Sequence, residues 1–379
     1  MKMKLSDVCE INPKSEVLSD ETTVSFVSMS DVSENGKINV DTYRPYCDVK
    51  KGFSCFKDGD VLFAKITPCM ENGKGALAKG LKNGMGFGST EFHVLRPRHE
   101  IADGKWVYYL TAWSMFRKEA EKNMTGSAGQ KRVPKSFLEK YELTLPALKV
   151  QQRQVQTLDR IKRVIEIRQQ QLQALDDLVK ARFVEMFGDE KNILTLSDVC
   201  SIITDGTHQP PKFTTEGIPF LFVSNITGNK ITYDAEKFIN QETYDELIKR
   251  TPIEIGDVLL STVGSYGHPA VVKEERKFLF QRHIAYIKPK KELIDSDYLH
   301  GAILSPDVQN QIEEGVKGVA QKTLNLSEIK KMRIPVPVID KQTEFTSFVA
   351  QVDSVKDSVQ KALDKTQMLL DSLMQEYFG

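Results

Sequence analysis

The feature that most constrains this chain is a long internal repeat. The string LSDVC occurs at residues 5–9 and again at residues 196–200, which is an offset of 191 positions. Other identities recur at the same offset: Gln130-Lys131 with Gln321-Lys322, Gln151 with Gln342, and Phe187-Gly188 with Phe378-Gly379. An offset that returns along the chain indicates a duplicated unit, and this period is too long for a solenoid. We therefore predict two copies, residues 1–188 and 189–379, that differ mainly in their loops.

Each copy opens with a segment of mixed character. Short apolar or alternating runs, bounded by Gly, Pro, Asn and Asp, predict strands at VSFVSM, DVLFAKI, EFHVLRP, IPFLFVS, DVLLSTV and HIAYIKP. Helical patterns lie between them at residues 105–124 and 296–315. The sequence therefore predicts an α+β fold with two similar mixed α/β globules, residues 1–148 and 189–339.

Each copy closes with a long helical segment, residues 149–188 and 340–379. Apolar residues recur there at spacings of three and four, which places them on one stripe of a helix. The stripe residues are Leu158, Ile161, Ile165, Leu172, Leu175 and Val179 in the first copy, and Val349, Val352, Val359, Leu363, Leu370 and Leu373 in the second. Polar residues interrupt both stripes at Arg168, Lys356 and Thr366.

Two arrangements of these long helices are open. Each could cover its own globule, or the two could pair through their stripes as a coiled coil. We expect the pair, because a helix of this length reaches roughly 55–60 Å, more than one small globule needs. A pseudo-twofold axis relating the copies would make the helices antiparallel and leave them between the two globules. Such a molecule could place one reader on each half of an asymmetric, bipartite DNA target.

Composition excludes several classes of protein. The chain is 40% hydrophobic and 27% charged, as is typical of globular domains. It has no apolar run long enough to span a bilayer and opens without a signal-peptide pattern, so we expect a cytoplasmic protein with no membrane partner. The five cysteines show no metal-binding or disulfide spacing, so we expect Cys9 and Cys200 to be buried free thiols.

Several strings carry a resemblance to a known family. They are LFAKITPCMENGKGALA at 62–78, TGSAGQKRVPKSFLEKYELTLPALKVQQRQV at 125–155, ITDGTHQPP at 203–211, GIPFLFVSNITGNKI at 217–231, and the helix endings RFVEMFGD and LMQEYFG. In this order and duplicated, they make the whole chain resemble the specificity subunit of type I restriction-modification systems. The resemblance implies two target recognition domains that bind double-stranded DNA, separated by two spacer helices.

The resemblance also implies partners and a division of labour. The helices would dock two methyltransferase subunits, which would carry S-adenosylmethionine and methylate adenine, and a separate restriction-motor subunit would join for cleavage. This chain would be non-catalytic and would hold no cofactor and no metal. One departure concerns charge: residues 1–150 have net charge +4, whereas residues 188–339 have −3. Whole-chain charge is zero, so DNA binding would depend on local patches or on partners.

Candidate DNA contacts in the first copy lie in two loops. Gly-rich loops bring backbone amides and cations to phosphates, while Asn and Gln present edges that match adenine. The candidates are Lys65, Thr67, Asn72, Lys74, Lys79, Gln130, Lys131 and Arg132. The alternative for each is an ordinary solvated loop.

Candidate contacts in the second copy follow the same reasoning. They are Asp205, Thr207, His208, Asn225, Ser265, Tyr266, Arg282, Lys317, Gln321 and Lys322. His208 lacks the partners of a metal or catalytic site, so we interpret TDGTHQPPK as a polar turn that faces a DNA groove. The main alternative for the whole chain is a duplicated scaffold that binds proteins through its helices and reads no DNA.

Overall fold

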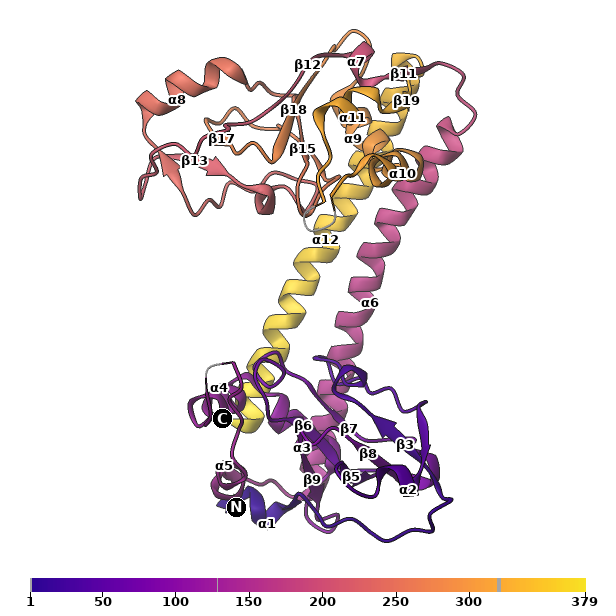
Figure 1. Ribbon diagram of the computed structural model, residues 1–379, viewed down its shortest axis with the longest axis vertical. Coiled ribbons are helices and arrows are strands. Elements are labelled where there is room, and N and C mark those ends of the chain that lie inside the picture. The colour runs from indigo at the N-terminus through magenta and orange to yellow at the C-terminus, as the bar shows by residue number, and fades with distance from the viewer. Residues whose placement is uncertain (1, 128, 319–321) are drawn as a thin grey trace. The chain divides into compact units, whose positions relative to one another are not determined.

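The structure is a computed structural model in which residues 2–127, 129–318 and 322–379 are described. Its backbone divides into two compact units (Figure 1). Unit 1 comprises Met1–Arg168 and Ala362–Gly379, and unit 2 comprises Gln169–Lys361. Each unit therefore combines one globule with one part of each long helix.

The globule of unit 1 is built from short strands and helices. In chain order these are β1 (Lys2–Lys4), α1 (Leu5–Val8), β2 (Cys9–Ile11), β3 (Thr23–Val27), η1 (Met29–Asp31), β4 (Tyr43–Pro45), α2 (Tyr46–Val49), β5 (Ser54–Lys57), β6 (Val61–Ala64), β7 (Gly75–Leu77), η2 (Lys82–Gly84), β8 (Met85–Gly88), β9 (Phe92–Pro97), α3 (Gly104–Ala112), α4 (Ser114–Lys122), α5 (Lys135–Lys140) and β10 (Glu142–Thr144). The long helix α6 (Leu148–Phe187) follows.

The globule of unit 2 repeats this plan with local differences. Its elements are β11 (Ile193–Thr195), α7 (Leu196–Val199), β12 (Cys200–Asp205), β13 (Ile218–Leu221), η3 (Val223–Asn225), β14 (Phe238–Ile239), α8 (Gln241–Leu247), η4 (Ile248–Arg250), β15 (Val258–Ser261), β16 (Pro269–Val271), β17 (Leu279–Phe280), β18 (Ile284–Pro289), α9 (Ser296–Leu304), α10 (Pro306–Gly315), α11 (Leu326–Lys331) and β19 (Arg333–Pro335). The second long helix, α12 (Ile339–Phe378), closes the chain.

Sheet topology confirms the predicted duplication. An antiparallel sheet has the strand order β2-β9-β6-β7 in unit 1 and β12-β18-β15-β16 in unit 2. A second sheet pairs β3 with β8 in parallel, as β13 pairs with β17. A two-stranded ladder, β1-β10 or β11-β19, joins the start of each globule to the segment before its long helix. Six predicted strand strings coincide with β3, β6, β9, β13, β15 and β18.

The repeated LSDVC string forms the same corner twice. Its leucine and valine are fully buried in both units, as Leu5 and Val8 and as Leu196 and Val199. The aspartate accepts a hydrogen bond from the backbone N–H three residues earlier, at 3.0 Å in unit 1 and 2.9 Å in unit 2, which closes the first turn of the helix. The cysteine then begins a strand. Cys9 and Cys200 are free and buried, as expected, and burial raises the pKa of each thiol to about 12.

The repeated glutamine fastens each long helix to its globule. Gln151 is fully buried; its Oε1 accepts from the Asp103 N–H at 2.9 Å, and its Nε2 donates to the Ile101 and Pro146 carbonyls at 2.8 Å each. Gln342 makes the equivalent three bonds to the Asp295 N–H and to the carbonyls of Leu293 and Pro337. Both amides satisfy buried backbone groups, which explains why the same residue occurs at both positions.

The helical pattern at residues 105–124 forms two helices. Trp113 has an extended backbone, with φ −63° and ψ 131°, and separates α3 from α4. Ser305 divides α9 from α10 in the same way, with φ −62° and ψ 150°. Periodicity alone misses this break, because apolar residues such as Tyr109 and Phe116 continue into the same core on either side of it.

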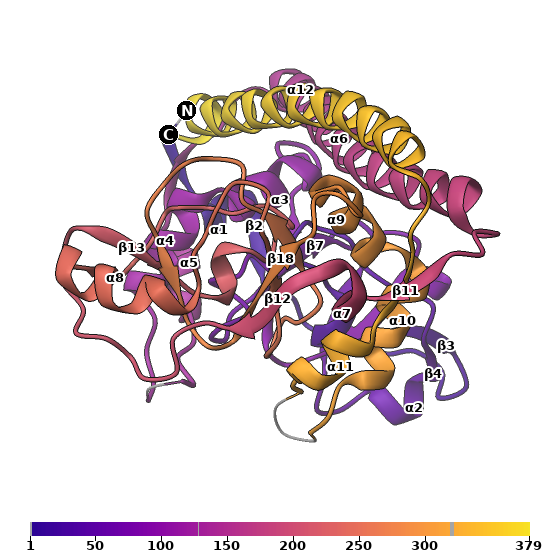
Figure 2. The same cartoon turned by 90° about the horizontal axis from the view of Figure 1, so that it is seen from above.

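The long helices pack together in antiparallel fashion within each unit (Figures 1 and 2). In unit 1, Leu158 and Ile165 of α6 share a core with Leu370 and Met374 of α12. In unit 2, Phe183 and Phe187 near the end of α6 stack on Phe345 near the start of α12. All twelve predicted stripe residues are at least partly buried, and Leu158, Ile165, Val352 and Leu370 are buried.

The polar residues that interrupt the stripes bind across the helix pair. In unit 1, the guanidinium of Arg168 donates to the Ala362 carbonyl and to the Thr366 hydroxyl. In unit 2, Lys356 forms an ion pair with Asp176. These contacts satisfy polar groups that an apolar seam would leave unpaired. Among the described residues, no helix has the length and apolar character needed to cross a bilayer.

Candidate nucleic-acid interface

Two loops meet beside the end of strand β6 in unit 1. One is the β6–β7 loop, residues 65–74, and the other is the loop at 125–132, where Thr125 and Arg132 pair through two backbone hydrogen bonds. The Thr67 N–H donates to the Lys131 carbonyl at 3.0 Å, and the Val133 N–H donates to the Lys65 carbonyl at 2.9 Å. The structure therefore brings together five of the predicted contacts, namely Lys65, Thr67, Gln130, Lys131 and Arg132.

Unit 2 builds the same junction with different side chains. The Leu324 N–H donates to the Thr262 carbonyl at 2.8 Å, and the Gly264 N–H approaches the Lys322 carbonyl at 3.4 Å. Lys317 pairs with Thr323 as Thr125 pairs with Arg132 in unit 1. The repeated Gln-Lys string thus belongs to the same loop in both copies, although Gln321 lies outside the described residues.

Arg132 fastens the unit 1 junction. Its Nε and Nη2 bind the carboxylate of Glu91 at 2.9 and 2.8 Å, and its Nη1 donates to the Gln130 carbonyl at 3.1 Å. The hydrogen bond from Arg132 lowers the pKa of Glu91 and in turn raises that of Arg132. The guanidinium of Arg132 is thus engaged by a carboxylate, and its contact with a phosphate stays a prediction. Lys131, next to it, is exposed.

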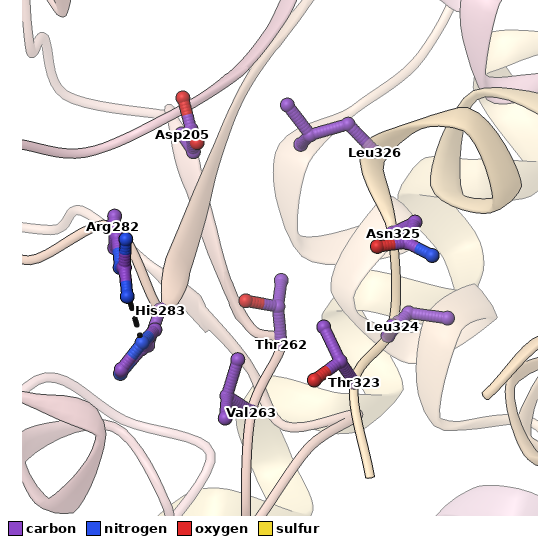
Figure 3. A pocket seen from close by; sticks show the side chains of 9 residues that line it. All are labelled: Asp205, Thr262, Val263, Arg282, His283, Thr323, Leu324, Asn325 and Leu326. Carbon is purple, nitrogen blue, oxygen red and sulfur yellow. Dashed lines mark hydrogen bonds between the residues drawn. The ribbon is translucent and has the colours of Figure 1, made fainter. Parts of the chain in front are cut away.

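The corresponding place in unit 2 is a polar pocket of about 270 Å³. Its lining residues are Asp205, Thr262, Val263, Arg282, His283, Thr323, Leu324, Asn325 and Leu326 (Figure 3). His283 replaces Glu91, since the carbonyls of both accept from the residue that follows the neighbouring strand, and Thr323 replaces Arg132. Figure 3 shows Arg282 and His283 on one side of the pocket and Thr323 and Asn325 on the other.

Charged side chains surround this pocket. Asp205 binds the Nε2 of His208 at 2.8 Å and also pairs with Arg250. The Nε of Arg282 donates to the Nε2 of His283 at 3.4 Å. Burial, followed by the charge of Arg282, lowers the pKa of His283, so this imidazole is neutral at pH 7. The pocket can thus offer both donors and acceptors, which suits a base edge better than a purely cationic surface would.

The remaining unit 2 candidates lie in the turn and the loops that adjoin this pocket. The Thr207 N–H donates to the Phe280 carbonyl at 3.0 Å and the Arg282 N–H to the Thr207 carbonyl at 3.0 Å, which joins the TDGTHQPPK turn to the pocket. The Tyr266 hydroxyl donates to Glu313 at 2.9 Å and lies 3.4 Å from the Nζ of Lys322. Ser265 and Lys317 are exposed.

Three predicted contacts do not fit this interface. Asn225 is buried; its Oδ1 accepts from the Phe222 N–H at 2.9 Å and its Nδ2 donates to the Thr232 and Asp234 carbonyls, so the side chain stabilises a turn. Lys79 follows β7 beside the start of β6, at the end opposite the junction. The Nζ of Lys74 donates to the Met29 carbonyl at 3.0 Å and is partly buried. Asn72 stays exposed in the β6–β7 loop.

Sequence reasoning missed three residues at these junctions: Glu91, Arg250 and His283. A signal existed for two of them, because Glu91 and His283 are 192 positions apart, the same offset that relates Pro97 to Pro289. No comparable signal marks Arg250, which comes from η4, 45 residues away from Asp205. In the described part of the chain, no group of three His, Cys, Asp or Glu side chains is placed to hold a metal ion.

Comparison with known proteins places this architecture in a family. The type I restriction modification DNA specificity domain matches twice, over residues 1–177 and 189–366. The EcoAI specificity subunit of Escherichia coli is 36% identical over 257 residues, covering 65% of this chain and 42% of that protein. The E. coli EcoEI specificity subunit is 41% identical over 174 residues, covering 45% of this chain and 29% of that protein. The chain thus spans less than half the length of these relatives.

Solved structures support the fold over the full length. One, from work on assembly and conformational transition of the type I R-M system, has a TM-score of 0.62 at 19% identity and covers 100% of this chain and 97% of its own. The type I S subunit from M. genitalium has a TM-score of 0.52 at 15% identity, covering 100% and 96%. These likenesses concern the fold alone. Because this family matches both halves of the chain, the chain belongs to the type I restriction modification DNA specificity domain family.

Proposed function

We propose that this chain is the DNA-recognition subunit of a type I restriction-modification complex, in which each unit reads one half of a bipartite, asymmetric target. The observation that carries the proposal is the duplicated junction of two loops. The same backbone contacts occur in both units, whereas the side chains differ: an Arg132–Glu91 ion pair in one, a polar pocket in the other. A common scaffold with different loop chemistry is what two different half-sites require.

The proposed contacts are those that stay accessible at these junctions. In unit 1 they are Lys65, Thr67, Asn72, Gln130 and Lys131; in unit 2 they are Asp205, Thr207, His208, Ser265, Tyr266, Arg282, Lys317 and Lys322. Gln321, which lies outside the described residues, is proposed with them on its sequence position alone. The exposed cations would hold phosphates, and the hydroxyl, amide and imidazole groups would read base edges. In this proposal the two target recognition domains are residues 1–148 and 189–339, and the spacer helices are residues 149–188 and 340–379.

The proposal includes partners that supply the chemistry. We assign methyltransferase subunits, two per chain and carrying S-adenosylmethionine, to the outer faces of the long helices. Large apolar side chains are exposed on these faces at Val164, Ile167, Leu178, Val184, Val355, Met368 and Leu369. Apolar side chains in such number on a helix surface favour contact with another protein. A restriction-motor subunit would complete a cleaving complex, and this chain would be a non-catalytic cytoplasmic component.

The experiment is to coexpress the chain with its methyltransferase subunit and map methylated adenines across the host genome. A reader yields one bipartite motif. A protein-binding scaffold that reads no DNA yields methylation without a motif, or none. In a second arm, residues 1–140 are exchanged for those of a homologue with a different target. One half of the motif then changes, whereas a change in both halves would contradict independent reading by the two units.

A further inference from the structure

A buried arginine in unit 1 holds the β6–β7 loop. Arg117 lies on α4, its side chain is 7% exposed, and its Nη1 donates to the carbonyl of Met70 at 2.7 Å. Met70 lies in the middle of that loop, between the proposed contacts Thr67 and Asn72. The Met70 carbonyl also accepts from the Gly73 N–H at 3.1 Å, so the loop closes its own turn and the Arg117 bond ties that turn to α4.

Unit 2 has the same contact made by a different residue. The Nε2 of Gln309 on α10 donates to the Ile303 carbonyl at 2.8 Å and to the Gly267 carbonyl at 3.1 Å. Gly267 lies in the β15–β16 loop, directly after the proposed contact Tyr266. Gln309 and Arg117 occupy equivalent positions. Each lies four residues after the break between its two helices. The Gln309 N–H donates to the Ser305 carbonyl at 3.0 Å, and the Arg117 N–H donates to the Trp113 carbonyl at 3.1 Å.

A glycine of unit 1 lies beside the guanidinium of Arg117, and a proline occupies the equivalent position in unit 2. Gly75 begins β7 at the position where Pro269 begins β16. A Cβ added at Gly75 would lie 2.9 Å from the Leu62 carbonyl oxygen and 3.4 Å from the Nη2 of Arg117, so the backbone of β6 excludes a side chain there and the guanidinium lies directly beside the glycine. In unit 2, where Pro269 stands at the position of Gly75, the shorter side chain of Gln309 makes the contact. The two solutions deliver a donor to the same loop by different means.

The charge of Arg117 is not what the contact uses. In the described part of the chain its Nε and Nη2 are buried without a hydrogen-bond partner, and burial lowers the pKa of the guanidinium to about 10. The group lies 5.4 Å from the centre of the Phe63 ring, which partly compensates the buried cation. Since a neutral amide does the same work at Gln309, the shared property is one N–H donor aimed at a loop carbonyl.

We propose that Arg117 and Gln309 are positioning residues, each holding the recognition loop of its own unit in the shape that reads one half-site. This inference rests on the proposed function. Neither side chain reaches DNA itself, because both act from beneath the loop through a backbone carbonyl. Base discrimination depends on side-chain placement to within a fraction of an ångström, so a released loop loses selectivity before it loses phosphate contacts.

The test uses the chain assembled with its methyltransferase subunit, with motif mapping and binding to matched and half-mismatched duplexes. Arg117→Met removes the donor and keeps an unbranched apolar side chain. Discrimination at the half-site read by unit 1 should fall about three- to tenfold, as the loss of one net hydrogen bond implies, with the other half-site unchanged. Gln309→Met should give the converse result. Arg117→Gln copies the solution of unit 2 and should restore discrimination to within about twofold.

Lys118→Met is the matched control, because Lys118 is the exposed neighbour on the same helix. Thermal unfolding of every variant separates loop release from loss of fold. The inference is overturned if Arg117→Met lowers Tm but leaves both half-site preferences as in the wild type, or if it weakens both halves equally. If the wild-type complex itself shows no bipartite motif, the proposed function fails, and that result is distinct from an unaltered preference in the variants.

Discussion

The repeated glutamines provide the sharpest test of how each globule is fixed to its helix. Gln151 has no exposed surface and supplies three hydrogen bonds to buried backbone groups of the α3 start and the α6 approach. Gln151→Leu has a similar volume but leaves one N–H and two carbonyls without this partner. At about 1–3 kcal/mol for each unsatisfied group, reduced by partial relaxation, we expect a loss of roughly 3–5 kcal/mol.

The assay is urea unfolding followed by far-UV circular dichroism. With an m-value of about 3 kcal/mol/M, the upper end of the usual range in urea and the one expected for a unit of this size, the transition that reports unit 1 should move down by roughly 1–2 M. Gln152→Leu, an exposed neighbour, serves as the control and should stay within about 0.5 kcal/mol of the wild type.

A second variant separates hydrogen bonding from packing. Gln151→Glu keeps an acceptor for the Asp103 N–H but turns a carboxylate oxygen toward the Ile101 and Pro146 carbonyls. It should therefore be at least as unstable as Gln151→Leu at pH 7, and recover relative to Leu at lower pH, where the protonated carboxyl can donate. If Gln151→Leu and Gln152→Leu unfold at the same urea concentration, the repeated glutamine is not the fastening that we describe.

Three further predictions concern charge and protonation. Replacing Lys356 by Ala should cost about 0.3–1 kcal/mol, because the half-exposed Asp176 loses its partner but keeps its solvent, and a double-mutant cycle of Lys356→Met with Asp176→Leu should measure a coupling of the same size. His93 donates from its Nε2 to the Val133 carbonyl at 2.8 Å, and burial lowers its pKa. The contribution of His93 to stability is therefore present above the ordinary pKa of 6.5 and is lost as pH falls through the lower folded-state pKa. His93→Gln should flatten that part of the stability–pH curve. Lys131→Ala should lower the salt-dependence slope of DNA binding by about 1, and an unchanged slope would remove this residue from the phosphate contacts.

The two-copy plan could be predicted because its signals are local and repeated. LSDVC recurs because its leucine and valine pack into the core of both units, and the two glutamines recur because they satisfy the same buried backbone groups, so identical side chains occur at one offset. The helix stripes could also be predicted, because the residues of a long helix that face a partner recur at a regular spacing. The break at Trp113 could not, as the apolar pattern continues through it.

The interface was only partly predictable, because its contacts join segments far apart in sequence. Arg132 was predicted to contact a phosphate, and its ion pair with Glu91, 41 residues away, could not be predicted from the sequence. Asn225 has the amide side chain that can read an adenine edge, but its amide forms hydrogen bonds within its own turn. The equivalent roles of Arg117 and Gln309 could not be predicted from the repeat, since the two units share the position in the helix and a side-chain N–H donor but not the residue type.

The central proposal is that two independent readers are joined by the paired helices, and lengthening both helices tests it most directly. Seven residues of heptad sequence are inserted where the units divide, between Arg168 and Gln169 in α6 and between Lys361 and Ala362 in α12. Seven residues add about 10 Å, or roughly three base pairs at 3.4 Å each. Insertion in one helix alone is the control and should abolish the motif. Methylome mapping of the doubly extended chain should show the same two half-motifs with a gap about three base pairs longer; an unchanged gap, or altered bases in either half, would contradict the account.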